Sequence, residues 1–233
     1  DYALFEGEGT TPRRRFHADK VSVIAVDDDP CRMIASRIHH RLRRVSAKDI
    51  QDQSRWPSLQ GPHNLQNAAA AVAVVAALGL TEADWRPGLA SFKGLPHRME
   101  RVAEANGVLF INDSKATNMN STWYALEEMK KPVILILGGV DKGNDYEVLK
   151  DLVKEKVKAI VCLGTDNRKI HEAFGEIVPL MVNTENAKDA VQSAFHFASK
   201  GDVVLLSPAC ASFDLFKNYE DRGNQFKQAV KEL

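Results

Sequence analysis

Short apolar runs alternate with amphipathic stretches through the second half of the chain. The runs are rich in branched residues and lie at 108–111, 133–137, 159–163, 178–182 and 203–206. Such runs are typical of buried strands, and the stretches between them repeat apolar residues at helical spacing. We expect the helices at 121–130, 146–154, 169–174, 187–199 and 213–230. The alternation predicts an α/β fold in which helices cover a mostly parallel sheet.

A hairpin is predicted at the start of this half. Residues 101–104 precede the first apolar run, and Asn106 and Gly107 lie between the two segments. Because Asn and Gly tolerate the positive φ of a tight turn, the sheet should begin with an antiparallel pair at its edge.

The first hundred residues have a different pattern. We expect a strand at 21–26, a helix at 31–40 with Asp29 as its N-cap, and a buried, Ala- and Val-rich helix at 64–80. A further short helix should begin at Thr81.

A domain boundary is predicted where Gly94, Leu95 and Pro96 interrupt the helical pattern. The two domains would be 1–96 and 97–233. A single strand–helix unit cannot cover its own apolar face, so the first domain has the pattern of a truncated α/β domain.

Composition narrows the class of partner. Lys and Arg total 31, Asp and Glu total 31, and the pI is about 7.2, so there is no electrostatic footprint for nucleic acid or an anionic membrane. No apolar stretch approaches the roughly 20 residues of a spanning helix. Three cysteines without CxxC spacing encode neither a disulfide framework nor a thiolate zinc site. We expect a monomeric cytoplasmic protein that binds small molecules.

Polar residues cluster where three of the predicted strands end. The clusters are 113–117, 138–143 and 207–212. Parallel strands present ligands beyond their carboxyl ends, so these clusters are expected to converge on one crevice. Lys115 and Lys142, with glycine amides and hydroxyl groups nearby, suit a ligand that carries carboxylates. The alternative is that the clusters are only capped helices and tight turns.

Two further pairs of residues could contact a nucleotide. Asn64 and Asn67 are three residues apart at the start of the Ala-rich helix, and paired amides suit adenine; the alternative is that Asn64 only caps this helix. His97 and Arg98 could reach phosphates, or Arg98 could bind a backbone carbonyl at the domain boundary. The sequence contains no metal-ligand spacing, no GxGxxG and no P-loop.

Four motifs together resemble one family. They are GLPHRME at 94–100, INDSKATN at 111–118, LGGVDK at 137–142 and SPACASFDLFKNYEDRG at 207–223. In this order they resemble the Mur ligase family, in particular its D-glutamate-adding branch. The resemblance implies that residues 1–96 are the end of a central ATP-binding domain and that 97–233 form a Rossmann-like C-terminal domain.

The resemblance also implies a reaction. In this branch ATP, usually with Mg²⁺, phosphorylates the terminal carboxylate of UDP-N-acetylmuramoyl-L-alanine, and the amine of D-glutamate then displaces the phosphate. The expected function is therefore that of an ATP-dependent ligase of peptidoglycan precursor synthesis. The P-loop, the Mg²⁺ ligands and the UDP-binding domain of the family have no counterpart here, so the chain alone is expected to be inactive.

Residue roles follow from the matched motifs. The D-glutamate site is expected to contain Lys115, Thr117, Lys142, Ser212, Phe213 and Tyr219, and the nucleotide site Asn64, Asn67, Arg98 and Asp113. Lys115, Lys142 and His97 are the expected catalytic residues. Two alternatives are another Mur-type amino acid ligase and a non-catalytic α/β module that binds an acidic small molecule.

Overall fold

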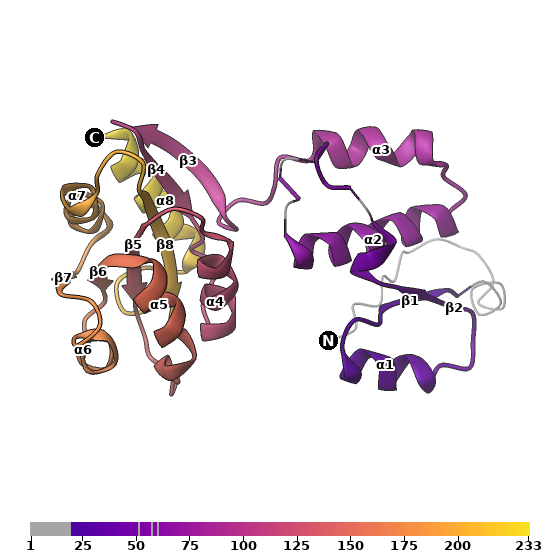
Figure 1. The fold of residues 1–233 in the computed structure, drawn as a ribbon, viewed down its shortest axis with the longest axis horizontal. Helices are drawn as coiled ribbons and strands as arrows, with labels where there is room; N and C mark the ends of the chain where they lie inside the picture. The colour runs from indigo at the N-terminus through magenta and orange to yellow at the C-terminus, as the bar shows by residue number, and fades with distance from the viewer. Residues whose placement is uncertain (1–19, 51, 57, 60) are drawn as a thin grey trace. The chain divides into compact units, whose positions relative to one another are not determined.

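The computed structural model describes residues 20–233 except 51, 57 and 60, and it divides the chain into two compact units. The division falls between Lys93 and Gly94 (Figure 1). Among the described residues, each unit has a sheet of its own, with two strands in the first unit and six in the second.

The C-terminal unit contains the predicted alternation of strands and helices. Its elements are β3 (Glu100–Ala105), β4 (Val108–Asn112), α4 (Met119–Glu128), β5 (Val133–Gly138), the 3-10 helix η2 (Tyr146–Leu149), α5 (Lys150–Lys156), β6 (Val157–Leu163), α6 (Arg168–Phe174), β7 (Leu180–Thr184), α7 (Ala187–Phe197), β8 (Val203–Ala209) and α8 (Tyr219–Lys231). The α/β class is confirmed.

The sheet has the strand order β3-β4-β8-β5-β6-β7. β3 is antiparallel to β4, and every other neighbouring pair is parallel. The predicted hairpin is confirmed, with Asn106 at φ +51° and Gly107 at φ +77° in its turn. β8, the last strand in the chain, lies between β4 and β5, so three loops that follow strands emerge side by side.

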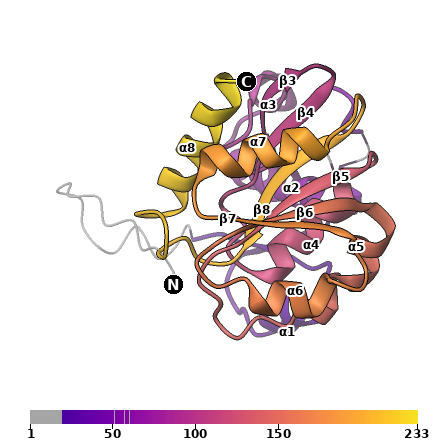
Figure 2. The ribbon, with the colours of Figure 1, turned by 90° about the vertical axis from the view of Figure 1, so that its left-hand side faces the viewer.

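Helices cover both faces of this sheet, as Figure 2 shows. α4, η2, α5 and α6 supply the core on one face, including Leu126, Leu149 and Phe174. α7 and α8 supply the core on the other face, including Val191 and Phe226. Because every residue of β5 is buried, its sequence is apolar throughout rather than alternating.

The last helix begins later than predicted. α8 starts at Tyr219, not at residue 213, because the Asn218 side chain accepts a hydrogen bond from the Asp221 amide and caps the helix there. The preceding residues form a loop in which Phe213 is 73% exposed. A smaller shift occurs in β7, which begins at Leu180, two residues after the predicted start.

The N-terminal unit is small and has a parallel two-stranded sheet. Its elements are β1 (Ser22–Ala25), α1 (Asp29–Ser36), β2 (Leu42–Val45), the 3-10 helix η1 (Ala47–Asp49), α2 (Pro62–Ala77) and α3 (Glu82–Ser91). Its apolar clusters contain few buried residues, and in one of them Ala69 and Ala73 of α2 pack against Val45.

The ends of two helices in this unit differ from those predicted, and one strand was missed. The N-cap of α1 is Asp28, whose carboxylate accepts from the Cys31 amide, and the helix ends at Ser36 rather than at residue 40. α2 begins at Pro62 after Gly61, so Asn64 lies within the first turn and does not cap the helix. The strand β2 was not predicted, because its two central residues are arginines.

A glycine in the C-terminal unit allows two loops to approach closely. Gly139→Ala is expected to lower the free energy of unfolding by about 2–4 kcal/mol, because a methyl group at its φ of +128° would overlap the Ala211 carbonyl oxygen. Gly143→Ala is the matched control, since its φ is also positive but its surroundings are open, and it should cost about 1 kcal/mol. Urea unfolding followed by circular dichroism measures both values. Equal losses would contradict the close approach.

Candidate functional site

The three polar clusters meet at the carboxyl ends of β4, β8 and β5. The Asp113 amide donates to the Leu206 carbonyl at 2.8 Å, which joins the loop after β4 to β8. The Val140 amide donates to the Ala211 carbonyl at 2.8 Å, which joins the loop after β5 to the loop after β8. The three clusters therefore lie side by side at one edge of the sheet, while their convergence on one crevice stays a prediction.

A buried arginine of α8 forms hydrogen bonds to two of these loops and so holds them together. The Arg222 guanidinium donates to the hydroxyl and the carbonyl oxygen of Ser114, both at 3.0 Å, and to the Cys210 carbonyl at 3.2 Å. The side chain is 1% exposed, and no ion pair to it is found among the described residues. Burial lowers its pKa to about 10, so it remains a cation at neutral pH.

Lys115 is held over an aromatic ring. Its ammonium lies 3.9 Å from the centroid of the Tyr219 ring, and its amide donates to the His97 carbonyl at 3.0 Å. Thr117 is half-buried, and its amide donates to the Lys115 carbonyl at 2.9 Å. Three residues of the expected D-glutamate site thus lie close together.

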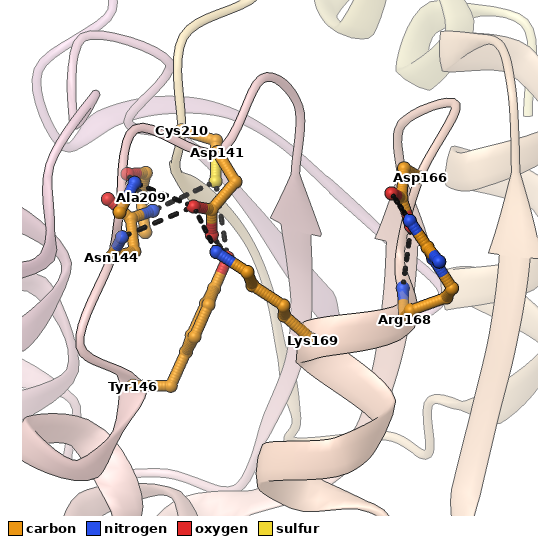
Figure 3. A network of polar contacts seen from close by, with 9 residues as sticks. Asp141, Asn144, Tyr146, Asp166, Arg168, Lys169, Ala209 and Cys210 are labelled. Atoms are coloured by element: carbon orange, nitrogen blue, oxygen red, sulfur yellow. Dashed lines mark hydrogen bonds and ion pairs between the residues drawn. The ribbon is translucent and has the colours of Figure 1, made fainter.

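The other expected residues of this site come from the neighbouring loops. Ser212 is buried, and its carbonyl accepts from the Phe216 amide at 2.9 Å, whereas Phe213 is exposed. Lys142 is exposed in the loop after β5. Its neighbour Asp141 is the centre of the polar network in Figure 3.

The network around Asp141 joins the loop after β5 to two other elements. The carboxylate accepts from the Lys169 ammonium of α6 at 2.9 Å and from the Tyr146 hydroxyl at 3.1 Å (Figure 3). The Asn144 side chain donates to the Ala209 carbonyl at 3.2 Å. Burial alone would raise the pKa of Asp141, but the hydrogen bonds from Lys169 and from loop amides outweigh it and hold the pKa below its ordinary value.

His97 is buried rather than open to a ligand. It is 6% exposed, and its Nδ1 lies 3.0 Å from the side-chain nitrogen of Asn112. Gly223 of α8 faces the ring so closely that a Cβ there would overlap it. Burial lowers the pKa of His97, which favours a neutral imidazole. The imidazole therefore packs inside the C-terminal unit, between Asn112 and Gly223.

The remaining expected nucleotide residues lie in both units. Arg98 is exposed, whereas Asp113 is buried and accepts hydrogen bonds from the Ser207 hydroxyl at 3.0 Å and the Met99 amide at 3.2 Å. In the N-terminal unit, the Asn67 side-chain nitrogen lies 3.4 Å from Asn64 Oδ1. The two amides therefore share one face of α2, as their spacing predicts.

A family model for the Mur ligase glutamate ligase domain matches residues 97–210. The UDP-N-acetylmuramoylalanine--D-glutamate ligase of Christiangramia forsetii is 59% identical over 176 residues, which are 76% of this chain and 40% of that protein. The chain belongs to the Mur ligase family. The resemblance predicted from the sequence motifs is confirmed.

Further relatives carry the same name. The UDP-N-acetylmuramoylalanine--D-glutamate ligase of Sphingopyxis alaskensis is 45% identical over 241 aligned positions, covering 100% of this Mur ligase chain and 55% of the relative. That of Bacteroides fragilis is 53% identical over 177 residues, 76% of this chain and 40% of the relative. The chain therefore spans between 40% and 55% of the length of these relatives.

Solved structures of Mur-type ligases share the fold. MurF from Acinetobacter baumannii has a TM-score of 0.65 at 20% identity and covers 92% of this chain and 52% of its own. A bifunctional folylpolyglutamate synthase/dihydrofolate synthase from Yersinia pestis has a TM-score of 0.63 at 21% identity, covering 92% and 53%. At these identities the likeness establishes the fold of this Mur ligase chain and nothing finer.

Sequence reasoning missed two features of this Mur ligase site. Arg222 and Asp141 both lie in motifs that the sequence singles out, but the sequence assigns no role to either of them. No local signal identifies Arg222, since an arginine between acidic residues and a glycine at the start of a helix is unremarkable unless its burial is known. Tyr146 and Lys169 lie on later elements, and only the fold brings them to Asp141.

Two absences apply to the part of the chain that the structure describes. Residues 20–233, without 51, 57 and 60, hold no group of three His, Cys, Asp or Glu side chains that could bind a metal ion. Within the same residues, no helix combines the length and the apolar character that crossing a membrane requires.

The buried Asp113 should make the stability of this Mur ligase chain depend on pH. Burial raises the pKa of Asp113 from 3.8 to about 7, so between about pH 4 and 7 the folded protein keeps a proton that the unfolded chain has released. The stabilisation is complete below about pH 4 and is lost as the pH rises through about 7. Asp113→Asn should remove a difference of roughly 2–4 kcal/mol between these limits, measured by urea unfolding. If the free energies of unfolding of the two proteins changed with pH in the same way, the raised pKa of Asp113 would be contradicted.

Proposed function

We propose that this chain provides the D-glutamate-binding part of an ATP-dependent ligase that joins D-glutamate to UDP-N-acetylmuramoyl-L-alanine. One observation carries the proposal: three of the four motifs shared with that branch lie at adjacent strand ends, so their lysines and hydroxyl groups lie along one edge of the sheet. The names of the relatives at 45–59% identity support it.

Amide formation requires an activated carboxylate and a free amine. In the proposed reaction the γ-phosphoryl group of ATP passes to the terminal carboxylate of UDP-N-acetylmuramoyl-L-alanine and forms an acyl phosphate. The amine of D-glutamate attacks its carbonyl carbon, loses a proton, and inorganic phosphate leaves. Lys115, Lys142 and Ser212 would bind the carboxylates of D-glutamate, because charge-assisted hydrogen bonds to carboxylates are strong and leave the amine free. Thr117, Phe213 and Tyr219 would complete this site.

The nucleotide roles are proposed for residues of both units. Asn64 and Asn67 would contact adenine, and Arg98 and Asp113 would lie near the ribose and the phosphates. We propose that His97 positions the segment around it and does not touch the substrate, since its imidazole is buried against Asn112.

Magnesium does not fit the described residues, which offer no cluster of carboxylate or imidazole ligands. The sequence also has no P-loop. We expect the 233-residue chain to bind D-glutamate but not to turn over by itself.

Titration of the chain with D-glutamate, followed through backbone amide NMR signals, tests the proposal. We expect selective shifts around Lys115, Lys142 and Ser212, with L-glutamate as the control ligand. Lys142→Ala should weaken D-glutamate binding about tenfold or more, because it removes a charge-assisted hydrogen bond. Lys154→Ala, which removes an exposed lysine of α5, is the matched control and should bind as the unaltered chain does.

Each other outcome has a definite meaning. Normal affinity in Lys142→Ala would reject the assignment of that lysine. Equal shifts with both isomers would favour a module that binds acidic small molecules without selecting D-glutamate, and stronger binding of a different amino acid would favour another Mur-type ligase.

A further inference from the structure

The loop that carries Lys142 is closed by the side chain of its neighbour. Asp141 Oδ1 accepts from the Gly143 amide at 2.7 Å and from the Asn144 amide at 3.3 Å. Side-chain bonds to amides two and three residues later fix a turn, in this case the turn that has Lys142 at its apex.

The same carboxylate joins this turn to two other elements. It accepts from Lys169 of α6 at 2.9 Å and from the Tyr146 hydroxyl at 3.1 Å, as Figure 3 shows. Asn144 in turn donates to the Ala209 carbonyl and to the Cys210 sulfur, both at 3.2 Å. We call the set of Asp141, Asn144, Tyr146 and Lys169 the Asp141 clamp.

The Asp141 clamp also contains a negative charge next to Lys142, and this charge is paired. An unpaired carboxylate next to Lys142 would attract that ammonium and repel an anionic ligand. The Lys169 ammonium pairs with Asp141, and no hydrogen bond or ion pair among the described residues engages the Lys142 ammonium. The carboxylate can therefore shape the turn without occupying the lysine that the ligand needs.

We propose that Asp141 is a positioning residue that holds Lys142 in place for an anionic ligand, and that Lys169 neutralises Asp141 so that Lys142 stays available. This inference rests on the proposed binding of D-glutamate by Lys142. It assigns roles to two residues outside the expected D-glutamate site.

The surroundings of the pair set the size of the effect. The Lys169 side chain is 58% exposed and the Asp141 side chain 21%, and both line a hollow of about 460 Å³ together with Asp166, Arg168 and Glu172. Because water and salt reach this pair, we expect changes of several-fold rather than of several orders of magnitude.

Three variants separate charge from shape. Lys169→Met should weaken D-glutamate binding about three- to tenfold, because it leaves the Asp141 charge beside Lys142. Asp141→Asn combined with Lys169→Met should restore much of the affinity, since no uncompensated charge remains. Asp166→Asn is the matched control: it breaks the exposed pair with Arg168 on the same side of the domain and should leave affinity unchanged.

The order of the affinities decides the proposal. If the double variant binds D-glutamate no better than Lys169→Met does, the neutralising role is overturned. A clamp that acted only through its structure would lose more affinity with each substitution. Loss of affinity in Asp166→Asn equal to that in Lys169→Met would also overturn it, since the effect would then be one of general surface charge.

Amide hydrogen exchange in the chain without ligand tests the positioning role separately. Asp141→Ala should speed exchange at Gly143 and Asn144 about tenfold or more, whereas Asp166→Asn should not. Unchanged exchange in Asp141→Ala would overturn the positioning role. If the unaltered chain fails to bind D-glutamate, the proposed function is wrong. The exchange experiment uses no ligand and still tests whether Asp141 fixes the turn.

Discussion

The buried guanidinium of Arg222 is the interaction on which the shape of the site depends. A cation taken out of water is costly unless its donors are all used, and here the acceptors come from Ser114 in the loop after β4 and from Cys210 in the loop after β8. The cost is therefore offset only when both loops and the first turn of α8 are in place together. Since the loops also carry Lys115 and Ser212, one buried side chain makes the arrangement of these two loops cooperative with the folding of the unit.

Topology explains why these loops can meet at all. β8 returns to the middle of the sheet and lies between β4 and β5, so Ser207 reaches Asp113 across 94 positions of sequence. Contacts this distant form only after most of the loop-closure entropy has been lost, and the site consequently depends on the complete C-terminal unit. No single segment of the chain could bring the loops of Lys115 and Lys142 to the same edge of the sheet.

The sequence was most informative where burial is complete. β5, β6 and β8 were found because strands covered on both faces are continuous apolar runs, and the strand-end clusters followed from them. β2 was missed because its two central residues, Arg43 and Arg44, do not form an apolar run. The start of α8 was misplaced because apolar residues precede the Asn218 cap and extend the apparent helical pattern. For the proposed site, motif positions supplied the residues that we expect to bind a ligand. The Asp141 clamp depends on register between elements, which local patterns do not contain.

Backbone strain links the start of the C-terminal unit to the same site. His97 and Met99 have φ of +63° and +47°, conformations that cost about 1–3 kcal/mol each for residues with a Cβ. Hydrogen bonds hold them there: the Met99 amide donates to Asp113, and the His97 carbonyl accepts from the Lys115 amide. Both partners belong to the loop after β4, which Arg222 also holds through its hydrogen bonds to Ser114. A change in that loop must therefore alter the strained segment, and a change in the segment must alter the loop that presents Lys115.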